Sequence, residues 1–217
     1  MTFKHSQILG LAFAALISNS ANAAQPDRNA QLEAAASACE DMIEIAQANG
    51  VAAAMPKIKV LKSALDAVRT TIPAEGLAQI DAKVLAIASA SKTGSATEFS
   101  LLAVETFKDI LSVMEWQDGP NAKRVALLDY QGFKLSILSN SSKPDWPAIA
   151  QTAQETTVNW QALKPALQEK ALQDLGSNVA KGIEQGSDQK NSGQVLFAAI
   201  VLLDSVDLIE NAMAKTP

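Results

Sequence analysis

Apolar residues recur at every third or fourth position along most of the chain after residue 26, and strand-length runs of strict alternation are hard to find. This spacing places apolar side chains on one face of an α-helix. Glycines, prolines and short polar runs divide the pattern into separate helices. We therefore expect an all-α protein, an antiparallel helical bundle of about seven to eight helices. The predicted helices span residues 27–49, 52–71, 74–91, 95–116, 121–138, 145–163, 165–182 and 194–215.

Several helix boundaries are marked by residues with known capping preferences. Gly50 can adopt the left-handed conformation that ends a helix. Asp145, with a proline two residues later, has the pattern of an N-cap followed by a first-turn proline. We also expect Pro165 to open the seventh helix, and that helix to fade over residues 182–186.

The last predicted helix has an unusually apolar first half. Val195 to Leu203 are consecutive apolar residues, so this part of the helix is hydrophobic on all sides and is expected at the centre of the bundle. The helix over 95–116 is nearly as apolar, and we expect the two to pack together. Residues 99–114 align with 198–213, with identities at Ile110 with Ile209 and Met114 with Met213. Two identities are not evidence of duplication, so two pseudo-repeated halves are a hypothesis that superposition of residues 74–116 on 164–215 would test.

The first residues have the three-part layout of a secretory signal peptide. Lys4 and His5 precede an apolar stretch over residues 8–17, and small residues follow up to Ala23. The apolar stretch is far shorter than the roughly 20 residues needed to span a bilayer, which argues against a permanent anchor. We expect residues 1–23 to be cleaved, leaving a single helical-bundle domain over 24–217 in the periplasm, with no stable membrane insertion.

The charge balance is acidic. The chain has 18 basic and 23 acidic residues, and loss of Lys4 with the signal peptide leaves 17 against 23, a net charge of −6. An acidic surface repels phosphates, so we expect neither nucleic acid nor anionic lipid as a partner.

Histidine and cysteine usage excludes several chemistries. His5 is the only histidine and leaves with the signal peptide, which excludes Ser-His-Asp and Cys-His catalysis as well as histidine-ligated metals. We expect a protein that is not an enzyme, although catalysis by carboxylates alone stays open. Cys39 is alone among alanines, and we expect it to be a small buried residue rather than a reactive thiol.

Two aspartates share helix faces with apolar residues. Asp204 falls on the same face as Phe197 and Leu208, and Asp129 on the same face as Phe133, so both are expected to point toward the core. A buried carboxylate needs a partner. One interpretation is a site for calcium, manganese or a similar hard cation. The other is a structural pairing with lysine or arginine from a neighbouring helix. The predicted metal ligands are Asp129, Asp204, Asp207, Glu105 and Asp109.

Three tryptophans are candidates for ligand binding, because indole rings line pockets for apolar or cationic molecules. They are Trp116, Trp146 and Trp160, all near predicted helix ends, where the alternative role is to cover the core. No glycine-rich phosphate loop or haem-attachment motif is present. We therefore expect a periplasmic, non-enzymatic helical-bundle protein that binds a protein partner or a small ligand between helices. The alternative is a carboxylate-based metal-binding protein, and no cofactor other than such a cation is expected.

Overall fold

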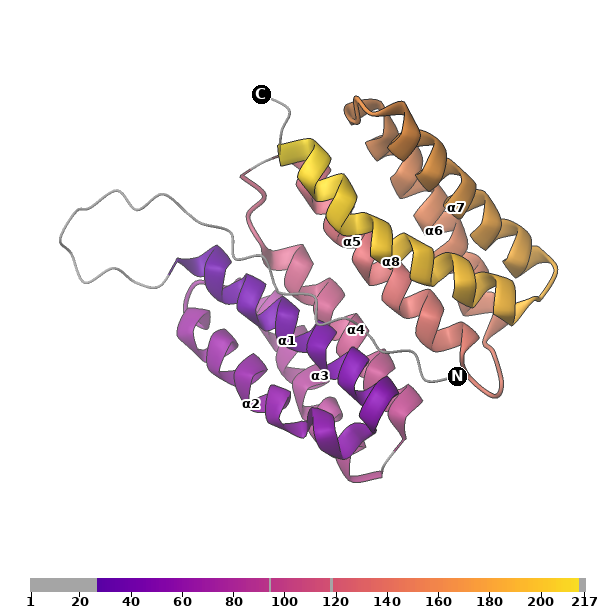
Figure 1. The fold of residues 1–217 in the computed structure, drawn as a ribbon. Coiled ribbons are helices and arrows are strands. Elements are labelled where there is room, and N and C mark those ends of the chain that lie inside the picture. Colours follow the sequence, from indigo (N-terminus) through magenta and orange to yellow (C-terminus); the bar gives the residue numbers. More distant parts are fainter. Residues whose placement is uncertain (1–26, 94, 118, 215–217) are drawn as a thin grey trace.

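The computed structural model describes residues 27–93, 95–117 and 119–214, and every regular element in these ranges is helical (Figure 1). The expected all-α bundle of about eight helices is confirmed. The predicted signal peptide, residues 1–23, lies outside the described residues. The α-helices are α1 (Arg28–Asn49), α2 (Val51–Val68), α3 (Ala74–Thr93), α4 (Ala96–Val113), α5 (Pro120–Ser139), α6 (Trp146–Leu163), α7 (Lys170–Asp188) and α8 (Ser192–Ala214), with a short 3-10 turn η1 (Lys164–Ala166) between α6 and α7.

Local capping explains several of these boundaries. The side chain of Asp27 accepts a hydrogen bond from the backbone N–H of Asn29 at 3.0 Å and begins α1. Gly50 ends α1 with a φ of 85°, which a residue with a Cβ rarely adopts. Asp145 accepts from the backbone N–H of Ala148 at 3.1 Å, which confirms its role as the N-cap of α6.

The helices form two four-helix units, each around its own hydrophobic core. In the first unit α1 packs against α2 and α4, and α3 packs against α4; in the second, α5 packs against α6 and α8, and α7 packs against α8. One core lies mainly within α1–α4 and the other within α5–α8. Figure 1 shows the units side by side, joined along α4 and α5. The order of neighbours is thus the same in both units. Short loops between antiparallel helices produce this order in any four-helix unit, so the two pseudo-repeated halves stay a hypothesis.

The expectation that α8 lies at the centre of the bundle, packed on α4, is wrong. The main neighbours of α8 are α5 and α7, while α4 belongs to the other unit. Phe197 is 70% exposed and Ile200 is 46% exposed, so one side of the apolar segment faces solvent. In the described part of the chain, α8 is the one helix long and apolar enough to cross a membrane by length and composition, but it carries three carboxylates and packs on two helices.

The expectation for the start and end of α7 is also wrong. Pro165 lies in the 3-10 turn, and α7 begins only at Lys170. The helix then continues through residues 182–186 to Asp188. A Cβ added at Gly186 would lie 2.9 Å from the side chain of Val195 in α8. The glycine therefore permits a close contact with α8, and that tertiary contact stabilises a segment with weak intrinsic helix propensity.

Candidate functional site

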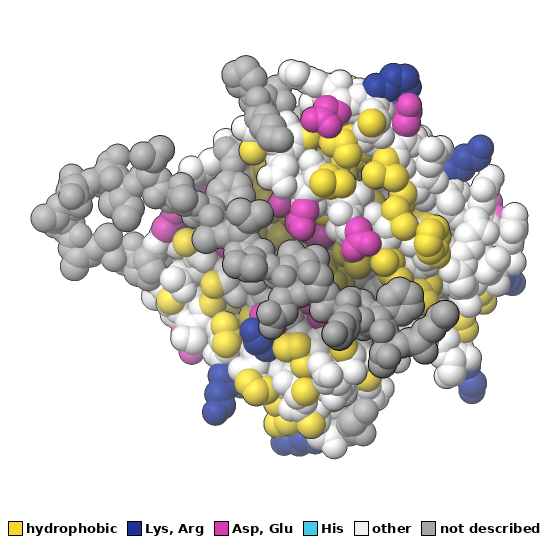
Figure 2. Space-filling view, in the orientation of Figure 1, with side chains coloured by type: hydrophobic (Ala, Val, Ile, Leu, Met, Phe, Trp, Pro, Cys, Tyr) yellow, Lys and Arg dark blue, Asp and Glu magenta, His cyan; other side chains and the backbone are white. Residues whose placement is uncertain are grey.

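One face of α8 combines exposed apolar and acidic side chains. We call it the α8 face; it comprises Phe197, Ile200, Asp204, Asp207 and Leu208. The three apolar members are 70%, 46% and 52% exposed in chain order, although large apolar side chains are normally buried. Figure 2 shows hydrophobic and acidic side chains intermingled over this helix.

The helices on this side of the molecule have few basic residues. Along α8 there are three acidic residues and no lysine or arginine. Along α1 there are four acidic residues, and the one basic residue, Arg28, is in the first turn. Neutralising partners for carboxylates are therefore scarce where these helices approach each other.

A group of carboxylates lies next to the α8 face, where the two units meet. We call it the carboxylate cluster; it comprises Glu40 and Glu44 of α1, Asp129 of α5, and Asp207 and Glu210 of α8. Partial burial, followed by the negative charge of Glu44 and its neighbours, raises the pKa of Glu40 to about 7. Burial and then the charge of Glu40 raise the pKa of Asp129 well above its ordinary value. Burial, together with Asp207, also raises the pKa of Glu210. These groups resist ionisation mainly because burial disfavours the charged form, and secondly because the nearby charges named here are all negative.

Close packing of α5 on α8 brings Asp129 into the cluster. A Cβ added at Gly132 would lie 2.8 Å from the side chain of Leu203, so the glycine lets α8 approach the α5 backbone. Asp129 is three residues earlier on α5, on the same side of the helix. Within the described residues, no ion pair forms at the side chains of Glu40, Asp129, Asp207 or Glu210.

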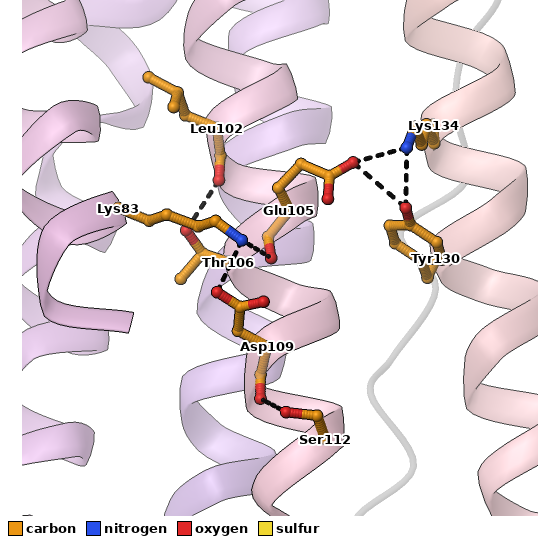
Figure 3. Close-up of polar contacts among 8 residues, drawn as sticks. All are labelled: Lys83, Leu102, Glu105, Thr106, Asp109, Ser112, Tyr130 and Lys134. Carbon is orange, nitrogen blue, oxygen red and sulfur yellow. Dashed lines mark hydrogen bonds and ion pairs between the residues drawn. The ribbon is translucent and has the colours of Figure 1, made fainter. Parts of the chain in front are cut away.

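The contact between α4 and α5 contains a second polar group of opposite character (Figure 3). The Nζ of Lys134 lies 2.7 Å from the Oε1 of Glu105 and donates a hydrogen bond to the hydroxyl of Tyr130 at 2.9 Å. That hydroxyl donates to Glu105 at 3.1 Å. The ammonium of Lys108 lies 5.0 Å from the centroid of the Tyr130 ring. We call these four residues the paired network.

The pKa shifts in the paired network show that its charges compensate one another. Burial alone would raise the pKa of Glu105, but the hydrogen bond and charge of Lys134 outweigh it, and the pKa is lowered. Burial would lower the pKa of Lys134, but its hydrogen bond to Glu105 raises it. Burial is the main cause that raises the pKa of Tyr130 to about 12. Each ionised group is thus stabilised in its charged form, and Tyr130 in its neutral form.

The structure does not bring the five predicted metal ligands together. Asp129 and Asp207 both belong to the carboxylate cluster. Glu105 is paired with Lys134, and Asp109 with Lys83 at 2.6 Å (Figure 3). For these two residues the structure therefore shows the alternative, a pairing with lysine from a neighbouring helix.

The expected core position of Asp204 is wrong, because the side of α8 that it shares with Phe197 and Leu208 faces solvent. No group of three or more Asp, Glu, Cys or His side chains in the described ranges is arranged to hold a metal ion. The metal site therefore stays a prediction that this geometry does not support.

The three tryptophans do not share a pocket. Trp160 is buried in the second core, where its indole N–H donates to the hydroxyl of Ser177 at 3.1 Å. Trp146 packs against the same core from the start of the same helix, about 21 Å along its axis from Trp160. Trp116 packs against the first core and donates to the carbonyl of Leu111 at 3.2 Å. These positions match the alternative role, in which each ring covers a core.

Cys39 is buried, as expected. Burial, and secondarily the charge of Glu40, raises the pKa of its thiol well above the ordinary value. The reactive thiolate is therefore disfavoured.

Three members of the carboxylate cluster, Glu40, Glu44 and Glu210, were missed by the sequence analysis. The signal that could have found them was the near-absence of basic residues from α1 and α8. Comparison of this chain with protein-family models, with curated proteins and with solved structures gave no match. The function must therefore be inferred from the geometry.

Proposed function

We propose that this chain is a periplasmic, non-enzymatic helical-bundle protein that binds a protein partner on the α8 face. The observation that carries the proposal is the exposure of Phe197, Ile200 and Leu208 on α8, the most apolar of the helices that the structure describes. Exposed apolar side chains gathered on one helix cost solvation free energy, and such patches commonly mark interaction surfaces. Export rests on the signal-peptide pattern in residues 1–23.

A protein partner fits the molecule better than a small ligand between helices. The two cores are filled by their own side chains, including the tryptophans. Within the described residues, a cleft of about 280 Å³ lies between α2 and α3, and another of about 110 Å³ lies near Ser100 and Asn140. Both are below the roughly 300–1,000 Å³ typical of small-molecule sites. Arg69 and Asp81, which form an ion pair at 2.7 Å, line the larger cleft.

Site-specific photo-crosslinking tests this function. A photoreactive amino acid is placed singly at Phe197 or Leu208, and as matched controls at Val158 or Leu85, which are 60% and 68% exposed on α6 and α3. The expected result is the same partner protein crosslinked from both α8 positions in source cells and from neither control. Crosslinks of equal yield from all four positions, or none from the α8 positions, would contradict the proposal.

A further inference from the structure

The chemistry of the α8 face also indicates what kind of segment it binds. We propose that the α8 face is a docking surface for a cationic amphipathic helix of a partner protein. The apolar residues of that helix cover Phe197, Ile200 and Leu208, and its Lys or Arg side chains meet the exposed carboxylates of Asp204, Asp207 and Glu210. This inference rests on the proposed function and names the chemistry of its partner.

The spacing of the exposed residues suits a helical occupant. Phe197 and Leu208 are separated by eleven positions, which is about 16 Å or three turns of helix. Ile200 lies one turn from Phe197, and Asp204 lies one turn from Leu208. An apolar stripe of this length, interrupted by a carboxylate, is complementary to a helix with apolar residues every three or four positions and cations beside them.

Charge complementarity favours this occupant over the others that could cover the face. A second copy of the chain would place Asp204 and Asp207 against further carboxylates, because α8 has no basic residue. An anionic membrane surface would be repelled for the same reason. A partner with Lys or Arg beside its apolar stripe both buries the exposed side chains and relieves the repulsion within the carboxylate cluster.

The electrostatics of the free protein agree with this inference. The elements next to Asp129 contribute Glu40 and Glu44 from α1 and Asp207 and Glu210 from α8, and these charges repel its carboxylate. The nearby cations Lys134 and Lys108 of the α4–α5 contact are already engaged with Glu105 and the Tyr130 ring. A cation supplied by a partner would therefore meet Asp207 and Glu210, which form no ion pair with any side chain in the described ranges.

Three synthetic 18-residue helical peptides serve as the probe, each with leucines on one face and with lysine, glutamine or glutamate at the remaining positions. Binding to the protein is measured by fluorescence anisotropy at pH 7.5 in low and in high salt. The expected result is that the lysine peptide binds at least about tenfold more tightly than the glutamine peptide, that salt removes the difference, and that the glutamate peptide does not bind.

Matched variants locate the binding. The double variant Phe197→Ser with Leu208→Ser is expected to weaken binding of the lysine peptide at least about tenfold, because it removes the apolar contact. Val158→Ser is the control for removing an exposed apolar side chain elsewhere. The triple variant Asp204→Asn, Asp207→Asn and Glu210→Gln is expected to lower the affinity for the lysine peptide to that for the glutamine peptide. The control triple variant, Glu75→Gln, Glu98→Gln and Asp66→Asn, removes as many charges from α2, α3 and α4 and is expected to change little.

Several outcomes would overturn the inference. In the peptide assay, they are equal binding of the lysine and glutamine peptides, or equal weakening of lysine-peptide binding by the two charge-removing triple variants. The other two are association of the protein with itself through the α8 face, and preferential binding to phosphatidylcholine vesicles that the α8 variants abolish. If any of these occurs while the α8 positions still crosslink one partner protein, the partner chemistry is wrong and the proposed function stands. If the crosslinks are also absent, both fail.

Discussion

Asp129 and Tyr130 are neighbours on α5, yet their side chains enter opposite electrostatic environments. Tyr130 points into the paired network, where Lys134 and Glu105 neutralise each other across the α4–α5 contact. Asp129 points into the carboxylate cluster, where Glu40 and its neighbours repel it. Both environments lie where the two four-helix units meet.

The difference between the two regions comes from the partner helices. The network forms between α4, which supplies Glu105 and Lys108, and α5, which supplies Lys134. The cluster forms where α5 packs on α8 and where the carboxylates of α1 lie within electrostatic reach, and α1 and α8 are acidic and almost without basic residues. The paired network holds the two units together, because its charges neutralise one another. The carboxylate cluster keeps an excess of negative charge, which a partner can neutralise. The following predictions test that distinction, from the largest expected effect to the smallest.

Lys134→Met is expected to destabilise the protein by about 2 kcal/mol at pH 7, because it leaves Glu105 partly buried without its cation. The lowered pKa of Glu105 makes this pair stabilising above pH 4.5, and that stability is lost as pH falls through the folded-state pKa. The cost of the substitution should therefore shrink in acid. Urea unfolding at pH 7 and pH 3 measures it, with Lys59→Met on the exposed side of α2 as the control. A cost below about 0.5 kcal/mol at pH 7 would show that the network does not stabilise the contact.

Glu40→Gln is expected to have the opposite sign and to stabilise the protein by about 1.5 kcal/mol at pH 8. The folded-state pKa of Glu40, about 7, lies above its unfolded value of 4.5. The free energy of unfolding is therefore highest below pH 4.5, where Glu40 is protonated in both states. It falls as pH rises through 7, because ionising the carboxyl costs more in the folded protein than in the unfolded chain. The gain from the substitution should disappear near pH 4, as thermal unfolding in a pH series would show. A stabilisation that does not change with pH would indicate a packing effect instead.

Glu40→Gln and Asp129→Asn are expected to be non-additive. Each substitution removes a charge that repels the other group, so the double variant should gain about 0.7 kcal/mol less at pH 8 than the sum of the singles. A double-mutant cycle by urea unfolding measures this coupling. Asp129→Asn paired with Lys59→Met is the control cycle and should be additive. Additivity in both cycles would mean that Glu40 and Asp129 do not interact.

Asp204→Asn is expected to change stability by less than about 0.5 kcal/mol at any pH between 4 and 8, because this carboxylate is exposed. Thermal unfolding of Asp204→Asn and of Asp129→Asn under the same conditions compares an exposed with a partly buried aspartate. A pH-dependent gain from Asp204→Asn as large as that from Asp129→Asn would place Asp204 inside the cluster.

The helical wheel grouped residues correctly but did not reveal which way each face points. Asp204 does share a face with Phe197 and Leu208, as the spacing predicted, but that face is exposed. Apolar residues on all sides of the segment from Val195 to Leu203 suggested a central helix. Periodicity has no information on how many neighbours a helix has, and α8 packs mainly on two.

The candidate site was predictable only in part for the same reason. The sequence singled out Asp129 and Asp207, and left open whether Glu105 and Asp109 bind a metal or pair with basic residues. Lys134 is on a different helix from Glu105, and Lys83 from Asp109, so spacing along one helix could not find these pairs. Glu40 and Glu44 of α1 act on Asp129 of α5 only through their charges in the folded protein, about 85–90 residues apart in sequence, which spacing along one helix could not reveal.

By itself the sequence determined the all-α class, most helix boundaries and the burial of Cys39. These properties depend on local caps such as Asp145 and Gly50 and on apolar spacing, which act over a few residues. Only the tertiary structure decided the division into two units, the exposure of the α8 face, and which carboxylates are neutralised. Those outcomes depend on which helices become neighbours, and close contacts such as Gly132 against Leu203 show that side chains distant in sequence fix that choice.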